Sequence, residues 1–409
     1  MKQLLLGLKL RLFFLPVVLF LFSLLPANAQ NGSQNAFGNE IIKPAAENLT
    51  MYLDSLRGKK VAVVANHTSL VEDVHLVDTL LKRGIEIVRI FGPEHGFRGD
   101  AADGAPVEDG VDVKTGIPVI SLYGDHKKPT SADLIGIDLV LFDIQDVGCR
   151  FFTYISTMTY VMEACAENDI PMTVLDRPNP NGYYVDGPVL ESKFSSFVGL
   201  HPVPIVYGMT IGEYALMVNG EHWLRSSKPC KLTVIPCTGY THASRYQLPV
   251  KPSPNLPVME SVYLYPSLCL FEGTSVSVGR GTDKPFTMIG HPLFHEGSFM
   301  FTPRAIAGVS DNPPFKGKTC YGQNLESAAS RLKEKGHVEL GWLTGMYKYM
   351  RGRSEFFTPY FEKLAGTNQL REQIESGMSP KAIRRSWQKG IREFRVIRGK
   401  YLLYPDFQE

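Results

Sequence analysis

Residues that could do chemistry gather in five polar segments in the first half of the sequence, each directly after a short apolar run. The segments begin at Asn66, Gly92, Ser121, Asp143 and Asp176, and most of them contain Gly or Pro. One such segment would be ordinary turn chemistry, since Gly, Pro, Asn and Asp favour turns. Five segments that also carry long functional side chains predict a ligand site instead.

Within these segments, Glu94 is the best candidate for proton transfer. It belongs to the Pro-Glu-His-Gly sequence at residues 93–96, a tight turn that would fix the direction of its carboxyl group. Cleavage of a glycosidic bond needs one carboxyl group to protonate the leaving oxygen and a second group to stabilise or attack the anomeric carbon. We place Asp143 in the second role, with Asp146 and Asp176 as alternatives. The structural alternatives are a salt bridge from Glu94 to an arginine, and aspartates that cap a helix or hold an arginine.

His67 and His95 raise the question of a metal. A zinc site needs three or more His, Cys or carboxylate ligands, and Asp143 would have to be the third. No H-E-x-x-H sequence occurs, so we expect no metal. His95 is assigned to the catalytic group, as a donor to sugar hydroxyls or as the residue that orients Glu94. No G-x-G-x-x-G follows the first strand, and G-x-S-x-G is missing, so neither a cofactor nor a serine nucleophile is predicted.

Two further charged residues lie in Gly-rich segments beyond residue 259. Glu272 stands beside Gly273, and Arg280 stands between Gly279 and Gly281. We expect this loop to reach over the site, where Arg280 would hold a substrate carboxylate through paired hydrogen bonds. A structural Gly-rich hairpin is the alternative.

Short apolar runs alternate with helical patterns over residues 41–258, which predicts βαβ units and a parallel sheet. The predicted strands are 60–65, 85–91, 118–122, 138–142 and 171–175, and the predicted helices are 44–56, 71–83, 152–167 and 210–224. The last helix begins with a capping box, Thr210 and Glu213. Residues 259–409 are first strand-like and then helical from 340 to 398. We therefore predict an α/β fold, a Rossmann-like doubly wound parallel sheet with a second, smaller α+β domain that closes a cleft.

In an open parallel sheet, ligands bind outside the carboxyl ends of the strands. The polar segments should therefore meet at one rim. The predicted substrate-binding residues are Asn66, Arg98, Gln145, Asp146, Arg150, Tyr154, Asp176, Arg177, Asn179, Glu272 and Arg280.

The first 29 residues have the features of a signal peptide. Lys2, Lys9 and Arg11 precede an apolar run at 12–25, and Ala-Asn-Ala follows at 27–29. A membrane anchor is the alternative, but Pro16 and Pro26 interrupt the run, which is short for a spanning helix. Residues 30–40 are predicted to be a polar linker. We expect export, to the periplasm or outside the cell, with no stable membrane anchor after cleavage.

The net charge argues against a nucleic-acid-binding protein, and the cysteine spacing argues against a disulfide-bonded one. Without the three basic residues of 1–29, 40 Lys and Arg face 41 Asp and Glu, so nucleic acid is not an expected partner. Cys230 and Cys237 bracket a predicted strand that would separate their Cα atoms by roughly 23 Å, beyond the ~7 Å limit for a disulfide. We expect most of the six cysteines to be buried thiols.

Several long segments resemble the exo-β-N-acetylmuramidase family NamZ, and they cover roughly residues 40–408. They are Asn66–Ser69, FGPEHGFRG at 91–99, DIQDVGCRFFTYISTM at 143–158, LDRPNPNG at 175–182, YGMTIGE at 207–213, PSPNLP at 252–257 and FEGTSVSVGRGTDKPF at 271–286. Two residues depart from the family pattern: Tyr207 stands where many members have His, and Ser275 where Asn is common.

The resemblance implies a Rossmann-like N-terminal domain, a smaller C-terminal domain and an active site between them. It also implies release of terminal N-acetylmuramic acid from the non-reducing ends of peptidoglycan oligosaccharides, such as this sugar linked to N-acetylglucosamine. The family's catalytic glutamate falls on Glu94. An arginine would suit the lactyl carboxylate of this sugar, and the candidates are Arg98, Arg150, Arg177 and Arg280.

Two questions stay open at this point. The 2-acetamido group of the sugar could itself supply the nucleophile, in which case Asp143 or Asp146 would orient the amide. The protein could also bind muropeptides without turnover, or act as a metal-assisted deacetylase or amidase.

Overall fold

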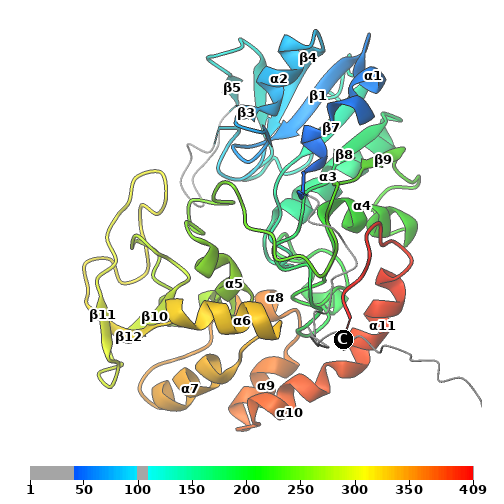
Figure 1. Cartoon of the computed structure of the whole chain (residues 1–409). Coiled ribbons are helices and arrows are strands. Elements are labelled where there is room, and N and C mark those ends of the chain that lie inside the picture. The colour runs from blue at the N-terminus through cyan, green and yellow to red at the C-terminus, as the bar shows by residue number, and fades with distance from the viewer. Residues whose placement is uncertain (1–40, 99–108, 409) are drawn as a thin grey trace, which may run out of the picture. The chain divides into compact units, whose positions relative to one another are not determined.

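The central element of the fold is β1 (Lys60–Ala65), the middle strand of a seven-stranded sheet with the order β5-β6-β4-β1-β7-β8-β9. The computed structural model describes residues 41–98 and 109–408, so the predicted signal peptide and linker lie outside the described residues. The other strands of this sheet are β4 (Glu86–Gly92), β5 (Gly110–Val111), β6 (Pro118–Ser121), β7 (Leu139–Asp143), β8 (Met172–Leu175) and β9 (Leu232–Ile235) (Figure 1). Neighbouring strands are parallel except for β5, which runs antiparallel to β6.

Residues of β1 alternate between two cores, as expected for a sheet covered on both faces. Val61 and Val63 pack in one core with α2 (Leu76–Lys82), and Ala62 and Val64 pack in the other with α3 (Tyr154–Glu167) and α4 (Ile211–Gly220). All four side chains are fully buried. Burial of a valine side chain stabilises a fold by about 1.5–3 kcal/mol, so this strand anchors both layers.

The predicted strands and the helices α3 and α4 are confirmed, and so is the capping box that starts α4. Thr210 Oγ1 accepts a 3.3 Å hydrogen bond from the Glu213 amide, and Glu213 Oε2 accepts a 2.9 Å bond from the Thr210 amide. The predicted helix at 44–56 is wrong in detail, because it is broken into η1 (Ala45–Glu47), η2 (Leu49–Met51) and α1 (Leu53–Leu56).

The predicted helix at 71–83 begins only at Leu76. A small hairpin, β2 (Leu70–Val71) and β3 (Val74–His75), takes the place of its first turn. Glu72, between the two strands, has a φ of 53°, which ends any helical path there. His75 then caps α2, because its Nδ1 accepts a 3.3 Å hydrogen bond from the Val77 amide.

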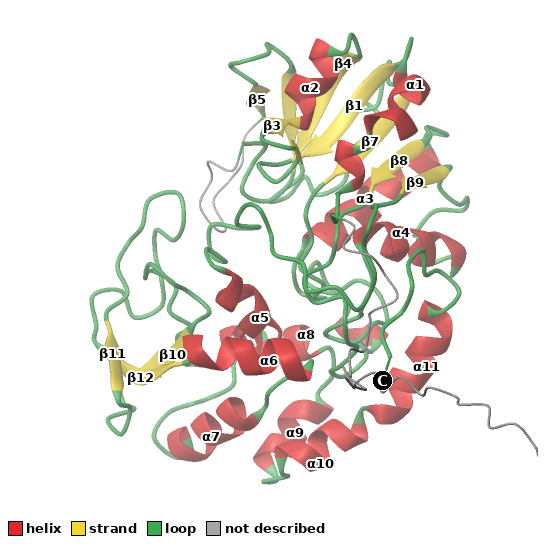
Figure 2. Cartoon of the chain, viewed as in Figure 1, coloured by secondary structure: helices red, strands yellow, loops and turns green. Residues whose placement is uncertain are grey.

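The second part of the chain, from Met259 onward, has a smaller sheet and more helices than the first part (Figure 2). Its three-stranded antiparallel sheet has the order β10-β12-β11, with β10 (Met288–His291), β11 (Phe299–Phe301) and β12 (Cys320–Asn324). Its helices are α5 (Met259–Leu268), η4 (Cys269–Gly273), η5 (Glu326–Ala328), α6 (Ala329–Lys335), α7 (Gly341–Met350), α8 (Phe361–Ala365), α9 (Gln369–Glu375), α10 (Pro380–Ser386) and α11 (Gln388–Arg398). The predicted α/β fold with a second α+β domain is confirmed.

One hydrophobic core runs through both parts. It joins Phe142 and Met158 of the first part to Phe271, Phe286 and Phe361 of the second. Helix α5 begins at Met259, where we placed the domain boundary, and the boundary itself stays a prediction. All six cysteines are free and buried, as expected. Among the described residues, no helix has the length and apolar character needed to cross a membrane.

Candidate active site

A cavity of about 570 Å³ lies where the loops after β4, β6 and β7 meet residues of α5, η4 and the Gly-rich loop. Five of the fourteen predicted site residues line it: Glu94, His95, Tyr154, Glu272 and Arg280. Its apolar wall is aromatic and includes Phe151, Phe152, Tyr265 and Phe286. A volume of this size is typical of small-ligand sites.

The turn at residues 93–96 directs Glu94 into this cavity. Strand β4 ends at Gly92, and the Gly96 amide then donates a 2.9 Å hydrogen bond to the Pro93 carbonyl. His95 and Gly96 have φ values of 69° and 77°, in the left-handed region that closes such a turn. The predicted tight turn is therefore confirmed, and its backbone fixes where the Glu94 side chain starts.

Among the described residues, one neutral donor holds the Glu94 carboxyl group. Thr153 Oγ1 donates a 2.8 Å hydrogen bond to Glu94 Oε2, and the side chain stays partly exposed to the cavity. No described arginine forms an ion pair with Glu94, so the salt-bridge alternative does not apply within the described residues. A carboxyl group held this way keeps one oxygen available to exchange a proton with a ligand.

His95 is the neighbour of Glu94 in the turn and is buried. Its Nε2 lies 3.3 Å from Ser253 Oγ, a hydrogen bond that joins the turn to the loop at residues 252–257. Backbone strain at a non-glycine residue with positive φ is tolerated when the surroundings hold it in place. The structure therefore places His95 where it can orient the turn that carries Glu94.

Glu272 and Arg280 form a close bidentate pair at the cavity wall. Arg280 Nε donates to Glu272 Oε1, and its Nη2 donates to Oε2 at 3.1 Å. The guanidinium also lies 5.2 Å from the centre of the Phe286 ring. Because Glu272 neutralises this guanidinium, Arg280 is less suited to hold a substrate carboxylate than we expected.

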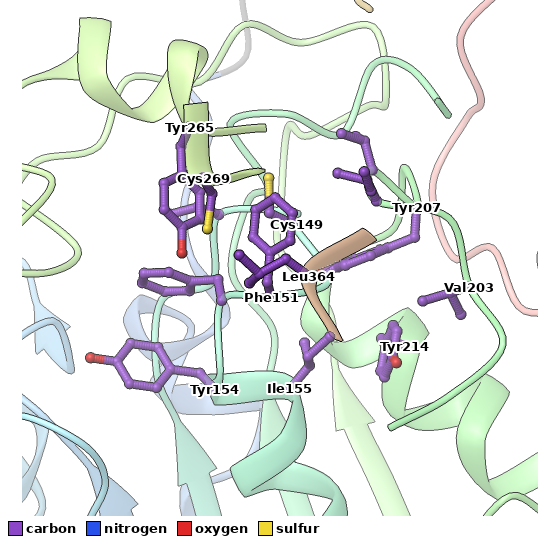
Figure 3. Packing of buried hydrophobic residues seen from close by; sticks show 14 of the residues in the cluster. Cys149, Phe151, Tyr154, Ile155, Val203, Tyr207, Tyr214, Tyr265, Cys269 and Leu364 are labelled. Carbon is purple, nitrogen blue, oxygen red and sulfur yellow. The ribbon is translucent and has the colours of Figure 1, made fainter. Parts of the chain in front are cut away.

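Aromatic packing supports the floor of the cavity. The rings of Phe151 and Tyr265 meet edge to face with centres 5.3 Å apart, close to Cys269 and Leu364 (Figure 3). Burial raises the pKa of Tyr265 well above its usual value, and negative charge on Cys269 or Glu272 would raise it further. The Tyr265 phenol is therefore protonated at neutral pH and keeps its hydrogen-bond donor.

Asp143, predicted as the second catalytic group, does not line the cavity. It is fully buried at the end of β7, where both of its oxygens accept from Arg177, at 2.6 Å from Nε and 2.8 Å from Nη2. Arg177 Nη2 also donates to the Leu70 carbonyl at 3.1 Å. The pair fastens the loop after β8 to the end of β7, so both residues have structural partners here.

Asn66 and Gln145 also turn inward. Asn66 Oδ1 accepts from the amide and the hydroxyl of Thr68, at 2.9 and 2.6 Å, and the Thr68 hydroxyl accepts a 3.0 Å bond from the Gln145 amide. Gln145 Nε2 donates to the Pro178 carbonyl at 2.8 Å. These contacts join three strand-end loops through buried hydrogen bonds.

The remaining aspartates, Asp146 and Asp176, are fully enclosed as well. Asp146 Oδ2 accepts from the Tyr207 hydroxyl and from the Gly148 amide at 2.7 Å. Asp176 accepts from Thr210 Oγ1 at 2.7 Å and so holds the start of α4. Burial raises the pKa of each carboxyl group to about 6, against the hydrogen bonds that lower it.

The side chains of Arg150 and Asn179 donate hydrogen bonds to backbone carbonyls inside the protein. The Arg150 guanidinium donates to four carbonyls, those of Pro188, Val203, Leu364 and Ala365, at 2.7–2.9 Å. Asn179 Nδ2 donates to the Met209 carbonyl at 2.7 Å. Neither side chain lines the cavity, so they support its walls from behind.

Arg98 lies in a separate hollow of about 440 Å³ with His67. Its guanidinium donates to both oxygens of Asp112, at 2.9 and 2.8 Å, and lies 3.6 Å from Asp78. Arg98 is thus engaged by two carboxylates outside the main cavity. Among residues 41–98 and 109–408, no group of three His, Cys, Asp or Glu residues is placed to hold a metal ion.

The structure also brings residues to the cavity that sequence reasoning missed. They include Lys127, Thr153, Phe197, Ser253 and Tyr360. Thr153 and Ser253 lie within segments that carry the family resemblance, at 143–158 and 252–257, but neither was assigned to the site. Lys127 lies six residues beyond the end of β6, where no local pattern marks it.

Two family models match the chain over nearly all of its described length. The model described as "Exo-beta-N-acetylmuramidase NamZ, N-terminal" matches residues 61–260, and its C-terminal counterpart matches residues 263–404. The chain is also 41% identical over 374 residues to the peptidoglycan beta-N-acetylmuramidase NamZ of Bacillus subtilis (strain 168), a match that covers 86% of this chain and 89% of that protein.

Two crystal structures of DUF1343 family proteins from Bacteroides fragilis NCTC 9343 have a similar fold. The first is 47% identical with a TM-score of 0.83, and the match covers 90% of this chain and 100% of that one. The second is 30% identical with a TM-score of 0.73, and the match covers 89% of this chain and 99% of that one.

Proposed function

Since the chain belongs to the exo-beta-N-acetylmuramidase NamZ family and is therefore a glycoside hydrolase, we propose that it releases terminal β-linked N-acetylmuramic acid from the non-reducing ends of peptidoglycan fragments, with Glu94 as the general acid. The relative from Bacillus subtilis is named for action on peptidoglycan, which supports the substrate class. The observation that carries the role of Glu94 is its place on a closed turn in the cavity, with one neutral donor and one free side for a ligand.

The chemical argument starts from the leaving group. A sugar alkoxide is a poor leaving group, so its oxygen must receive a proton as the glycosidic bond breaks. Glu94 is one of two carboxyl groups among the cavity-lining residues, and the other, Glu272, has both oxygens bound by Arg280. Glu94 is therefore the carboxyl group placed to give the proton.

For the second role, we retain attack by the substrate's own 2-acetamido group. Asp143 and Asp146 are enclosed by internal partners and do not line the cavity, so they do not orient this amide. Glu272 is the carboxylate that can take that place. A thiazoline analogue of N-acetylmuramic acid should then inhibit competitively, whereas a glycosyl adduct trapped on Glu272 would refute this route.

We further propose that the protein is exported, with the periplasm as its compartment, and that it acts in cell-wall turnover. The support is the charge, apolar run and Ala-Asn-Ala order within residues 1–29. N-terminal sequencing of the protein recovered from the producing cell's periplasm tests export, and a mature chain that still contains residues 1–29 would contradict it.

The decisive experiment compares two leaving groups in the wild type and the Glu94→Gln variant. A disaccharide of N-acetylmuramic acid and N-acetylglucosamine needs full protonation of its leaving oxygen, while a 4-nitrophenyl muraminide needs little. Loss of the general acid should lower kcat/KM by about 10²–10⁴-fold on the disaccharide and far less on the aryl glycoside.

Glu86→Gln is the matched control, because Glu86 is exposed at the opposite end of β4. It should leave both rates unchanged. Equal losses on both substrates in Glu94→Gln would remove the general-acid role. A wild-type protein that binds muropeptides and hydrolyses neither substrate would instead be a binding protein.

A further inference from the structure

We propose that Lys127 is the specificity-determining residue that binds the lactyl carboxylate of N-acetylmuramic acid, an inference that rests on the proposed function. Lys127 lies on the loop after β6 and lines the cavity. Of the four arginines predicted for this task, three do not line the cavity, and the fourth, Arg280, is paired with Glu272. Lys127 was not predicted at all.

The predicted arginines fail for physical reasons that the structure supplies. Arg98 is held by Asp112, and Arg177 by Asp143. Arg150 is fully buried against four carbonyls. Arg280 does line the cavity, but Glu272 already offsets its positive charge through two hydrogen bonds.

Lys127 differs because its partners are neutral. Its ammonium donates to the Gly124 carbonyl and lies 5.5 Å from the centre of the Phe197 ring. The Phe197 ring is itself stacked on Tyr160 of α3, with centres 6.0 Å apart and an angle of 18° between the rings. These contacts hold the ammonium in place without cancelling its charge, and none of the described carboxylates pairs with it.

The next residue shows the contrast. The Lys128 ammonium lies 2.7 Å from Glu167 and 3.3 Å from Glu163, and Lys128 does not line the cavity. Of two adjacent lysines, one is therefore neutralised by two carboxylates outside the cavity, and the other brings to the cavity a positive charge that no described carboxylate pairs with. A ligand with a carboxylate complements that charge, and N-acetylglucosamine, which lacks the lactyl group, does not.

The test measures binding by calorimetry, so it does not depend on turnover. The ligands are N-acetylmuramic acid, its lactyl amide and N-acetylglucosamine, each titrated into the full mature protein. The wild type should bind the acid roughly 10- to 100-fold more tightly than the amide, the usual effect of one hydrogen bond between charged groups. Lys127→Met should lose this preference and bind acid and amide alike.

Three further variants, Lys127→Arg, Lys128→Met and Arg280→Met, complete the design. Lys127→Met keeps the aliphatic stem against Phe197, and Lys127→Arg should restore most of the preference because it restores the charge. Lys128→Met should behave as the wild type does. A preference that persists in Lys127→Met, or one that is lost in Arg280→Met instead, would overturn the assignment, as would a wild type that does not distinguish the acid from the amide.

Steady-state kinetics give a second readout. In Lys127→Met, KM for the muraminide should rise while kcat stays within about 3-fold of the wild-type value. The reason is that the lost contact stabilises the bound substrate and the transition state equally. If the wild type hydrolyses no muraminide, the proposed function fails, and the calorimetric comparison still decides whether Lys127 reads the carboxylate.

Discussion

The hydroxyl of Thr153 donates a 2.8 Å hydrogen bond to Oε2 of Glu94, across 59 positions of sequence. Thr153 is the residue just before α3, and Glu94 lies in the turn after β4. The bond therefore joins the loop after β4 to the start of α3 at the cavity. It engages Oε2 of Glu94, and in the proposed reaction the carboxyl group gives its proton to the substrate.

Replacement of Thr153 by valine should lower kcat/KM on the disaccharide about 2- to 12-fold, because one hydrogen bond contributes roughly 0.5–1.5 kcal/mol. The ratio of its kcat/KM on the disaccharide to that on the 4-nitrophenyl muraminide should stay far above the ratio in Glu94→Gln, since Glu94 is still present to protonate the leaving oxygen. Thr153→Ser keeps the hydroxyl and should recover most of the activity. Equal activity of the valine and serine variants would show that the hydroxyl does not position Glu94.

The backbone of the turn offers a second prediction. Gly96 has a φ of 77°, and alanine at such a position costs about 1–2 kcal/mol. Gly96→Ala should reduce both stability and kcat, because relief of the strain moves the turn that carries Glu94. Gly84 has the same φ of 77° with open space around it, in the turn between α2 and β4. Gly84→Ala should lose similar stability with unchanged kcat, and equal kcat losses in the two variants would contradict the prediction.

Local patterns were sufficient to predict most of the sheet and the turn. The run at 60–65 is apolar on both faces, and β1 is indeed buried on both faces. The turn at 93–96 was predictable because Pro and Gly restrict the backbone. The helix at 71–83 was predicted too long, because the left-handed residue Glu72 carries no local signal of its conformation.

The site was harder to predict than the sheet, since position at a strand end does not decide which way a side chain points. Asp143 is the last residue of β7 and Arg177 lies two residues after β8, and they pair with each other inside the protein. Buried backbone and charged groups must find such partners. Lys127 and Lys128 are adjacent and chemically identical, so only the three-dimensional structure separates the one in the cavity from the one paired with Glu167.

The buried pair of Asp143 and Arg177 gives a stability prediction. Asp143→Ala leaves the Arg177 guanidinium buried without its carboxylate, which should cost about 3–5 kcal/mol in the free energy of unfolding. The double variant Asp143→Leu with Arg177→Met removes both charges and should recover much of that loss. Urea denaturation measures both. If Asp143 were catalytic, the double variant would fold and have no activity, whereas we expect the folded fraction to keep most of its kcat.

Asp146 gives the last prediction, which concerns pH. Burial raises the pKa of Asp146 to about 6, from about 3.8 in an unfolded chain. Between these two pKa values, Asp146 is protonated in the folded protein and ionised in the unfolded chain. The free energy of unfolding therefore falls as pH rises from about 4 to about 6. Asp146→Asn has no such titration and can still accept from Tyr207 and Gly148 through its amide oxygen.

The difference in unfolding free energy, variant minus wild type, should therefore grow between pH 4 and 6 and then level off. The total change should be on the order of 1–3 kcal/mol, since one pKa unit corresponds to about 1.4 kcal/mol. Urea unfolding of both proteins at half-unit pH steps measures it, and all other titrating groups cancel in the difference. A difference that is constant across this range would mean that Asp146 is ionised in the folded protein throughout, held so by the Tyr207 hydroxyl and the Gly148 amide.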